Sequence, residues 1–164
     1  MVDIEIDGSF GEGGGQILRT CLSLSILTGK SFRIYNLRAK RTNPGLRAQH
    51  LCAVKSLMSI SGAEVKGAEI GSKEIIFFPK PAKPGNYQID IGTAGSTILV
   101  FQTLLPALLF LDRASELELI GGTHNPKSPC FDFIQECFLP LLSFLGIKVE
   151  AGLSSYGFYP RGGG

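Results

Sequence analysis

Residues 7 to 20 read Asp-Gly-Ser-Phe-Gly-Glu-Gly-Gly-Gly-Gln-Ile-Leu-Arg-Thr, and the rest of the chain is organised around this stretch. A short alternating run (Val2, Ile4, Ile6) precedes it, and a helical pattern of apolar residues follows it. The sequence therefore predicts a strand, a glycine turn and the start of a helix.

This glycine turn is suited to an anion, because glycine lets a ligand approach the backbone and the first N–H groups of a helix are unpaired. It matches neither of the two named phosphate motifs. The Gly-Lys-Ser/Thr of a P-loop is absent, and Gln16 stands where a dinucleotide fingerprint needs glycine. A ligand loop and a plain tight turn are equally good interpretations of these residues.

The composition is that of a globular protein of 164 residues, one large domain or two small ones. A net charge of +2 is too small to indicate nucleic-acid binding by bulk charge, so any such binding must come from a local patch. The four cysteines form no CxxC pair, which favours reduced thiols in a cytoplasmic protein. The acidic N-terminal strand is unlike a signal peptide, and the most apolar run, 98–111, is too short to span a membrane.

The second half of the chain repeats the first. Gly8 aligns with Gly92, Gly62 with Gly146 and Val65 with Val149, a period of about 84 residues. The alternative is that any α/β chain can be aligned with itself in this way.

We expect an α+β fold of two repeated β-α-β-α-β-β units, residues 1–80 and 85–164, joined by a proline-rich linker. Each unit would pack two helices on one face of a four-stranded sheet. The last two strands of the second unit are expected at 147–150 and 157–160. The chain ends on three glycines directly after an expected strand, so we also expect that the natural protein continues beyond residue 164.

A basic loop follows the second expected strand. It contains Arg38, Lys40 and Arg41, with Arg47 at the start of the next helix. Arginine presents a planar fork that matches phosphate, and the loop should lie on the same side as the glycine turn. A solvated charged loop is the alternative interpretation. Gln16, Gln49 and Gln102 each lie near a helix start, where an amide can bind a neighbouring backbone or a base or ribose.

No side chain stands out as a catalyst. His50 lies on an apolar helix face, and His124 has no obvious carboxylate partner nearby in sequence. Cys130 and Cys137 lack a visible base. Glu12 is the best carboxylate for a metal that bridges phosphates. The residues alone therefore predict a phosphate- or nucleotide-binding α+β protein without an identifiable catalyst.

At these positions the sequence resembles the RNA 3′-terminal phosphate cyclase family. The similar segments run through the chain in the family's order, at 7–19, 38–51, 67–72, 93–106, 121–125 and 157–164. The resemblance covers all of this chain and about the first half of a family member. It implies a ligase-type enzyme that uses ATP to convert an RNA 3′-phosphate end into a 2′,3′-cyclic phosphate, through a histidine–AMP and an RNA–adenylate intermediate.

The resemblance also implies roles for individual residues. Glu12 would bind Mg²⁺ or Mn²⁺, Gln102 would contact ATP, and Pro129 would lie near the adenine. The residues that would hold phosphates or the RNA end are Arg19, Arg38, Arg41 and Gln49.

The family's nucleophilic histidine lies near its C-terminus, and neither His50 nor His124 matches that motif. We therefore expect no catalytic residue in this chain and no AMP adduct on it alone. Two other functions fit the same repeat, a non-catalytic relative in ribosome assembly and an enolpyruvyl transferase. The surface on which the missing half should dock is expected to be apolar and exposed, and it could drive self-association into a homo-oligomer.

Overall fold

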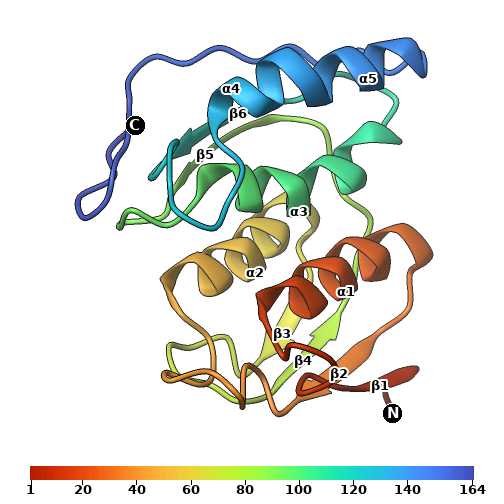
Figure 1. Cartoon of the computed structure of the whole chain (residues 1–164). Coiled ribbons are helices and arrows are strands. Elements are labelled where there is room, and N and C mark those ends of the chain that lie inside the picture. The colour runs from red at the N-terminus through yellow and green to blue at the C-terminus, as the bar shows by residue number, and fades with distance from the viewer.

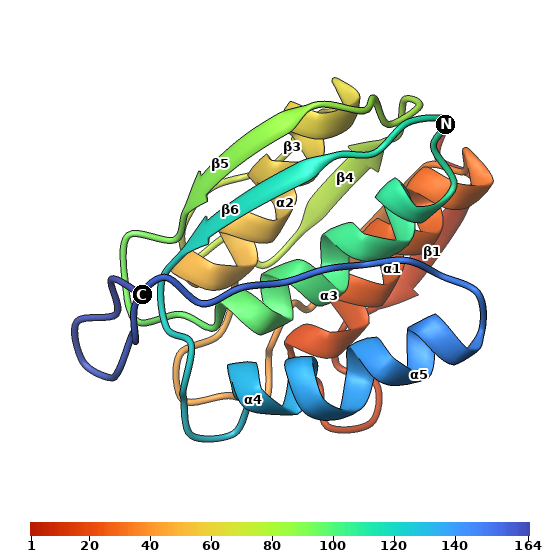
Figure 2. The same ribbon diagram turned by 90° about the horizontal axis from the view of Figure 1, so that it is seen from above.

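The computed structural model describes residues 1–164, and the first half of the chain folds as the sequence predicts. Its elements are β1 (Ile4–Asp7), α1 (Gly15–Thr28), β2 (Phe32–Tyr35), α2 (Ala48–Ser61), β3 (Glu64–Lys66) and β4 (Ile75–Phe78). The four strands form one sheet in the order β1-β2-β4-β3. β1 and β2 are parallel, and β4 pairs antiparallel with both β2 and β3. α1 and α2 lie side by side on one face of this sheet (Figures 1 and 2).

Both helices of this first unit end on a glycine in the left-handed conformation. Gly29 and Gly62 have φ of 70° and 71°, and their N–H groups donate to Ser25 and Met58. Residues that carry a side chain rarely adopt this backbone conformation, so glycine at these positions favours ending the helix there.

The second half begins with β5 (Asn86–Asp90), α3 (Thr97–Leu109) and β6 (Glu116–Ile120), with β5 and β6 parallel. One continuous helical segment follows, made of α4 (Phe131–Phe133), the π-helical turn η1 (Ile134–Phe138) and α5 (Leu139–Phe144). The fold is therefore α+β, as predicted.

The predicted four-stranded sheet of the second unit is wrong, since that sheet has only β5 and β6. Residues 147–150 form no strand, because Val149 packs against a small apolar cluster of Ile98, Phe131, Ile134 and Leu139. Residues 157–160 run beside the loop after β6 instead of joining the sheet, and Phe158 makes only isolated bridges, to His124 and to Gly162.

One apolar core joins the two halves. Its 18 buried residues come mostly from α1, α2, the first sheet, β5 and α3, and the others from the loops between these elements. α3 lies against α1 and α2, and the Ser23 hydroxyl of α1 donates to the Thr103 carbonyl of α3 at 2.8 Å. The boundaries at residues 80 and 85 stay a prediction, but the helices on both sides of them bury their apolar faces together.

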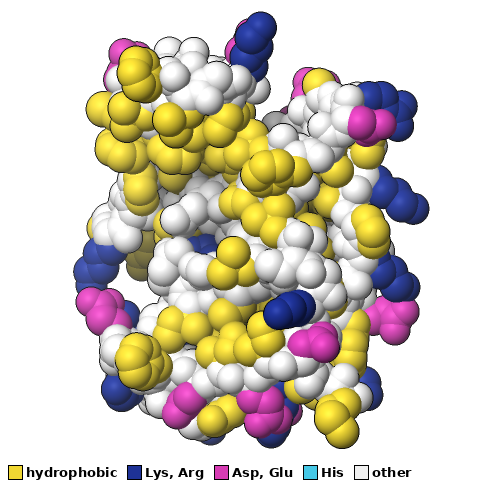
Figure 3. All heavy atoms as spheres, turned by 90° about the vertical axis from the view of Figure 1, so that its right-hand side faces the viewer, with side chains coloured by type: hydrophobic (Ala, Val, Ile, Leu, Met, Phe, Trp, Pro, Cys, Tyr) yellow, Lys and Arg dark blue, Asp and Glu magenta, His cyan; other side chains and the backbone are white.

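Large apolar side chains also remain on the surface. Leu141, Phe144 and Leu145 of the α5 segment are 64%, 89% and 71% exposed. Figure 3 shows hydrophobic side chains gathered on this side of the molecule, most densely over α5. None of the helices combines the length and the apolar character that crossing a membrane would need.

We predict that Leu104→Ala in α3 destabilises the whole chain. Leu104 is fully buried in the shared core, so its truncation should cost about 2–5 kcal/mol of unfolding free energy. Urea unfolding followed by circular dichroism should show one transition at lower urea. Leu145→Ala, at an exposed leucine, is the matched control and should change stability by less than about 0.5 kcal/mol. Two separate transitions, with only one of them moved by Leu104→Ala, would contradict a shared core.

Candidate functional site

The N-terminal ends of three helices meet at one end of the molecule. α1, α2 and α3 all begin at the same side in Figure 1. Gln49 near the start of α2 accepts the Ser96 N–H of the α3 cap at 2.9 Å. His50 lies against Gly15 at the start of α1, so closely that a methyl group added to Gly15 would overlap the imidazole. Three positive helix ends therefore point to one region.

The three helix starts are capped differently. Gly14 precedes α1 and has no side chain to cap it, whereas at α2 the His50 imidazole accepts the Arg47 N–H. α3 differs, because the Ser96 hydroxyl accepts the Leu99 N–H at 3.2 Å. Uncapped helix starts can donate to a phosphate oxygen.

The basic loop lies over the glycine turn, as the sequence predicted. Lys40 donates to the Gly11 carbonyl at 3.2 Å, and Arg41 forms an ion pair with Glu12 at 3.2 Å. Arg41 also lies beside Gly14, where a methyl group would come within 3.1 Å of its Nη2 atom. Glu12 and Arg41 are 91% and 45% exposed, so both can exchange partners with a ligand.

Arg38 has a different position from Arg41. Its guanidinium donates to the carbonyls of Asn43 and Gly45 at 2.7 and 2.9 Å, which closes the basic loop. Burial, together with the nearby Arg47 and Arg41, lowers the pKa of Arg38 below its ordinary value. Arg38 therefore shapes the loop and adds positive potential to the site.

A first cavity of about 240 Å³ lies between α1 and α3. Arg19 and Gln102, two residues singled out from the sequence, both line it. Arg19 Nη2 donates to Gln16 at 2.8 Å, whereas Arg19 Nε is buried and has no partner. Burial lowers the pKa of Arg19. A buried donor without an acceptor beside a cavity is the arrangement that an anionic ligand would satisfy.

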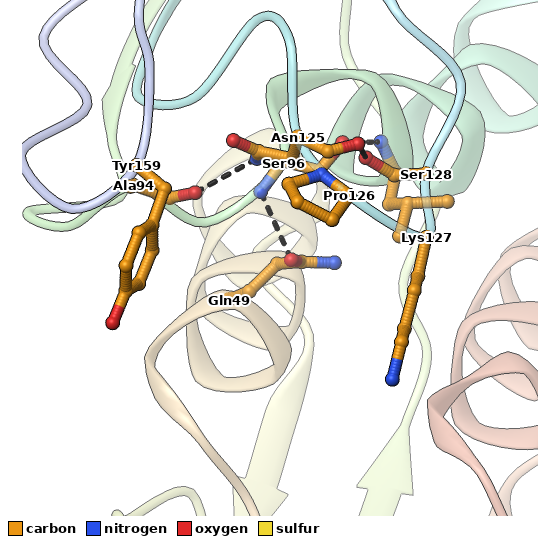
Figure 4. A pocket seen from close by; sticks show the side chains of 9 residues that line it. Gln49, Ala94, Ser96, Asn125, Pro126, Lys127, Ser128 and Tyr159 are labelled. Atoms are coloured by element: carbon orange, nitrogen blue, oxygen red, sulfur yellow. Dashed lines mark hydrogen bonds between the residues drawn. The ribbon is translucent and has the colours of Figure 1, made fainter.

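A second cavity of about 410 Å³ lies beside the N-terminal ends of α2 and α3 (Figure 4). Gln49, Asn125, Lys127 and Tyr159 line it. Asn125 Nδ2 donates to the Ala94 carbonyl at 2.8 Å, and its buried Oδ1 has no partner. Pro129 is exposed and lies outside the lining.

The structure thus places the sequence-predicted residues in three groups. Arg19 and Gln102 share the first cavity, Gln49 lines the second, and Arg41 with Glu12 lies on the glycine turn. Ser96 and Leu99 line one cavity and Gln102 and Pro106 the other, so both cavities lie along α3.

Sequence reasoning missed Asn125 and Lys127, which line the second cavity. Their signal was the parallel pairing of β5 and β6, because the loops after two parallel strands emerge at the same sheet edge.

His124 has the carboxylate partner that the sequence did not reveal. Its Nε2 lies 2.6 Å from Asp132 Oδ2, and its Nδ1 lies 2.8 Å from the Thr123 hydroxyl. The hydrogen bond from His124 lowers the pKa of the Asp132 carboxyl. The loop between them folds back on itself, so His124 and Asp132 are in direct contact although they lie eight positions apart in the sequence.

His50 is a half-buried neutral imidazole among arginines. Burial, and then the charges of Arg38, Arg19 and Arg47, lower the pKa of His50 to about 4. Its Nδ1 accepts the Arg47 N–H at 3.3 Å, so the neutral ring carries its proton on Nε2, beside Gly15. His50 is therefore a hydrogen-bonded packing residue that joins α1 and α2.

The fold is α+β, and arginines and helix starts surround its candidate site. The family model for RNA 3′-terminal phosphate cyclase matches residues 10–164, and the chain belongs to this family.

Individual relatives agree with this family. The chain is 60% identical over 164 residues to an RNA 3′-terminal phosphate cyclase of Staphylothermus marinus and covers 46% of that protein. It is 55% identical to one of Ignicoccus hospitalis and 54% identical to one of Ectopseudomonas mendocina, covering 46% and 47% of their lengths. The chain therefore spans about half the length of the curated relatives it matches.

We predict that His50→Asn removes part of the acid sensitivity of the fold. The pKa of His50 is near 6.5 in the unfolded chain and about 4 in the folded protein. Between these two values the unfolded chain binds the proton and the folded protein does not, so the free energy of unfolding falls as the pH drops through this window. From about pH 7 to about pH 4.5 the loss should be of the order of 2–3 kcal/mol.

The asparagine oxygen can accept the Arg47 N–H in place of Nδ1, which makes this variant the matched, non-titrating control. Urea unfolding at several pH values measures the difference. If both proteins lose stability in parallel as the pH falls, His50 is not the group responsible.

Proposed function

We propose that this chain forms the nucleotide- and RNA-end-binding part of an enzyme that uses ATP to convert an RNA 3′-terminal phosphate into a 2′,3′-cyclic phosphate. The observation that carries the proposal is the meeting of three helix starts with arginines in a family member. Two anionic substrates, a nucleotide and an RNA end, need such a region of positive potential. ATP supplies the activation, since adenylylation of the 3′-phosphate makes AMP the leaving group when the 2′-hydroxyl attacks.

Arg41 and the uncapped start of α1 are suited to hold a phosphate. Arg41 is half exposed and paired only with Glu12, so a phosphate could take over its planar fork. The neighbouring N–H groups of α1 would donate to the same anion.

Arg19 and Gln102 are the proposed nucleotide contacts. They line one cavity, and the buried Arg19 Nε still lacks an acceptor. The amide oxygen of Gln49 already accepts a hydrogen bond from the Ser96 N–H, so the Nε2 group remains available to donate to a ligand. Pro129, exposed beside the second cavity, remains the proposed adenine neighbour.

Glu12 could bind a divalent ion only if phosphates of the ligand supplied further oxygen ligands. Glu12 is one exposed carboxylate, and Mg²⁺ in such sites takes its other ligands from phosphate oxygens and water. The charge of Mg²⁺ or Mn²⁺ would neutralise the phosphates while Arg41 exchanges Glu12 for the ligand.

Neither histidine of this chain is the proposed nucleophile. His50 is enclosed between α1 and α2, and His124 is engaged by Thr123 and Asp132 on its two nitrogens. We assign the nucleophilic histidine to the part of the relatives that this chain does not span.

We predict that Arg19→Lys weakens ATP binding at least about tenfold, because lysine keeps the charge but loses the planar donors. Isothermal titration calorimetry with Mg–ATP measures the change. Arg113→Lys is the matched control, since Arg113 is 77% exposed and lies beyond the C-terminal end of α3. Equal affinities for Arg19→Lys and wild type would remove Arg19 from the nucleotide site. Tighter binding of phosphoenolpyruvate than of ATP would favour the enolpyruvyl transferase function.

We predict that this chain forms no covalent AMP adduct by itself. The measurement is intact mass after incubation with ATP and Mg²⁺, with and without the remaining part of the Staphylothermus marinus relative. An adduct on the added part alone supports the proposal. An adduct on this chain would make His50 or His124 the nucleophile and overturn the assignment. No adduct anywhere, with the two parts shown to associate, would favour a non-catalytic relative.

A further inference from the structure

Three different metal-ligating side chains meet in the loop after β6. A nitrogen of His124, the sulfur of Cys130 and an oxygen of Asp132 all lie within 4.8 Å of one another. None of them lines either cavity. The function proposed above uses none of the three as a ligand or catalyst.

The hydrogen bonds of His124 hold its ring in one orientation. The Thr123 hydroxyl lies 2.8 Å from Nδ1 and is itself fixed by the Gly157 N–H at 2.9 Å. Without a metal, Nε2 donates its proton to the Asp132 carboxylate, and Nδ1 accepts from the Thr123 hydroxyl. A metal that replaces this proton would be bound by Nε2 and the carboxylate together. The Thr123 hydroxyl can instead donate to the Gly157 carbonyl and accept from Nδ1, which is the outer hydrogen bond of metal-bound histidines.

The surroundings also suit a bound ion. The His124 side chain is only 19% exposed, because the rings of Tyr156 and Phe158 lie against it at centroid distances of 5.1 and 5.6 Å. Asp132, on the other side, is 64% exposed. The cluster therefore has an apolar wall and an open path from solvent.

We propose that His124, Cys130 and Asp132 bind a divalent transition metal, with zinc as the ion that their chemistry fits. A thiolate, an imidazole and a carboxylate are all zinc ligands, and water would complete the tetrahedron. Zinc–ligand bonds of about 2.0–2.3 Å put ligand atoms about 3.3–3.7 Å apart. The contact between His124 and Asp132, now 2.6 Å, would open by about 1 Å. Binding would release the Cys130 thiol proton to solvent.

Such an ion would fasten the loop that lines the second cavity. Asn125, Pro126, Lys127 and Ser128 lie between the ligands His124 and Cys130 and form one side of that cavity. A metal would therefore hold Lys127 and Asn125 in place beside Gln49. The proposal does not depend on the function proposed above, since it rests on the ligand geometry alone.

Cobalt substitution tests the site directly. The chelator-treated, reduced 164-residue protein is titrated with Co²⁺, which gives a thiolate-to-metal absorption band only when sulfur binds it, and then with Zn²⁺ as competitor. Wild type should bind one equivalent with that band. Cys130→Ser should lose the band, and Asp132→Asn should bind at least about tenfold more weakly.

Cys137→Ser is the matched control, because Cys137 is an exposed thiol in the same helical segment. It should titrate as wild type does. A band that disappears with Cys137→Ser and persists with Cys130→Ser would overturn the proposed ligand set. Absence of any band in wild type would overturn the site and leave a plain hydrogen bond between His124 and Asp132.

Alkylation gives a second readout that is independent of colour. Zinc should slow modification of Cys130 by a maleimide, located by peptide mass, and leave Cys137 unprotected. Equal rates at Cys130 with and without zinc would contradict the proposal, whatever the activity of the protein.

Discussion

The parallel pairing of neighbouring strands is the constraint on which the site depends. Asp7 at the end of β1 is paired with Tyr35 at the end of β2, so the glycine turn and the basic loop leave the sheet at the same edge. β5 and β6 repeat this arrangement, with Asp90 opposite Ile120. Packing of α3 on α1 and α2 then brings both pairs of loops to one end of the molecule. The strand pairing and the helix packing are therefore sufficient to place the loops of the site together.

Arginine serves two purposes around these loops. The Arg38 guanidinium donates to two carbonyls of its own loop and so stabilises the shape of that loop. Arg41 has a single, exposed ion-pair partner, and exposed ion pairs contribute little to stability. The chain therefore holds some positive charge in the framework and keeps the rest available for exchange. Glu12, the exposed acidic partner of Arg41, can give way to a ligand.

The first unit could be predicted closely from the sequence, because its signals are local. The alternation of Ile4 and Ile6, and the glycines after each helix, are read within a few residues. The last two strands of the second unit could not be predicted, because Val149 has an apolar cluster to join that forms only when α3 and the 131–144 helix pack together. The same chain pattern can serve a strand or a packed loop, and tertiary contacts decide between them.

Within the site, sequence reasoning found residues more reliably than contacts. It singled out Gln49, yet gave no indication that its oxygen would cap a different helix at Ser96. It found no partner for His124, because the contact with Asp132 depends on how residues 125–130 turn back to the start of α4. Residue types and helix positions follow from local pattern, whereas pairings across loops depend on a fold that the pattern does not specify.

The shared core has a consequence for the order of events during synthesis. α1 and α2 are complete once residue 61 has been added, but the core that covers them includes Val100, Leu104 and Ala107 of α3. A growing chain therefore carries two helices with uncovered apolar faces until α3 emerges. Contacts between residues that are far apart in the sequence form late, so they slow folding and prolong the exposure of apolar surface. The nascent first unit is the stage at which this protein would most need a chaperone.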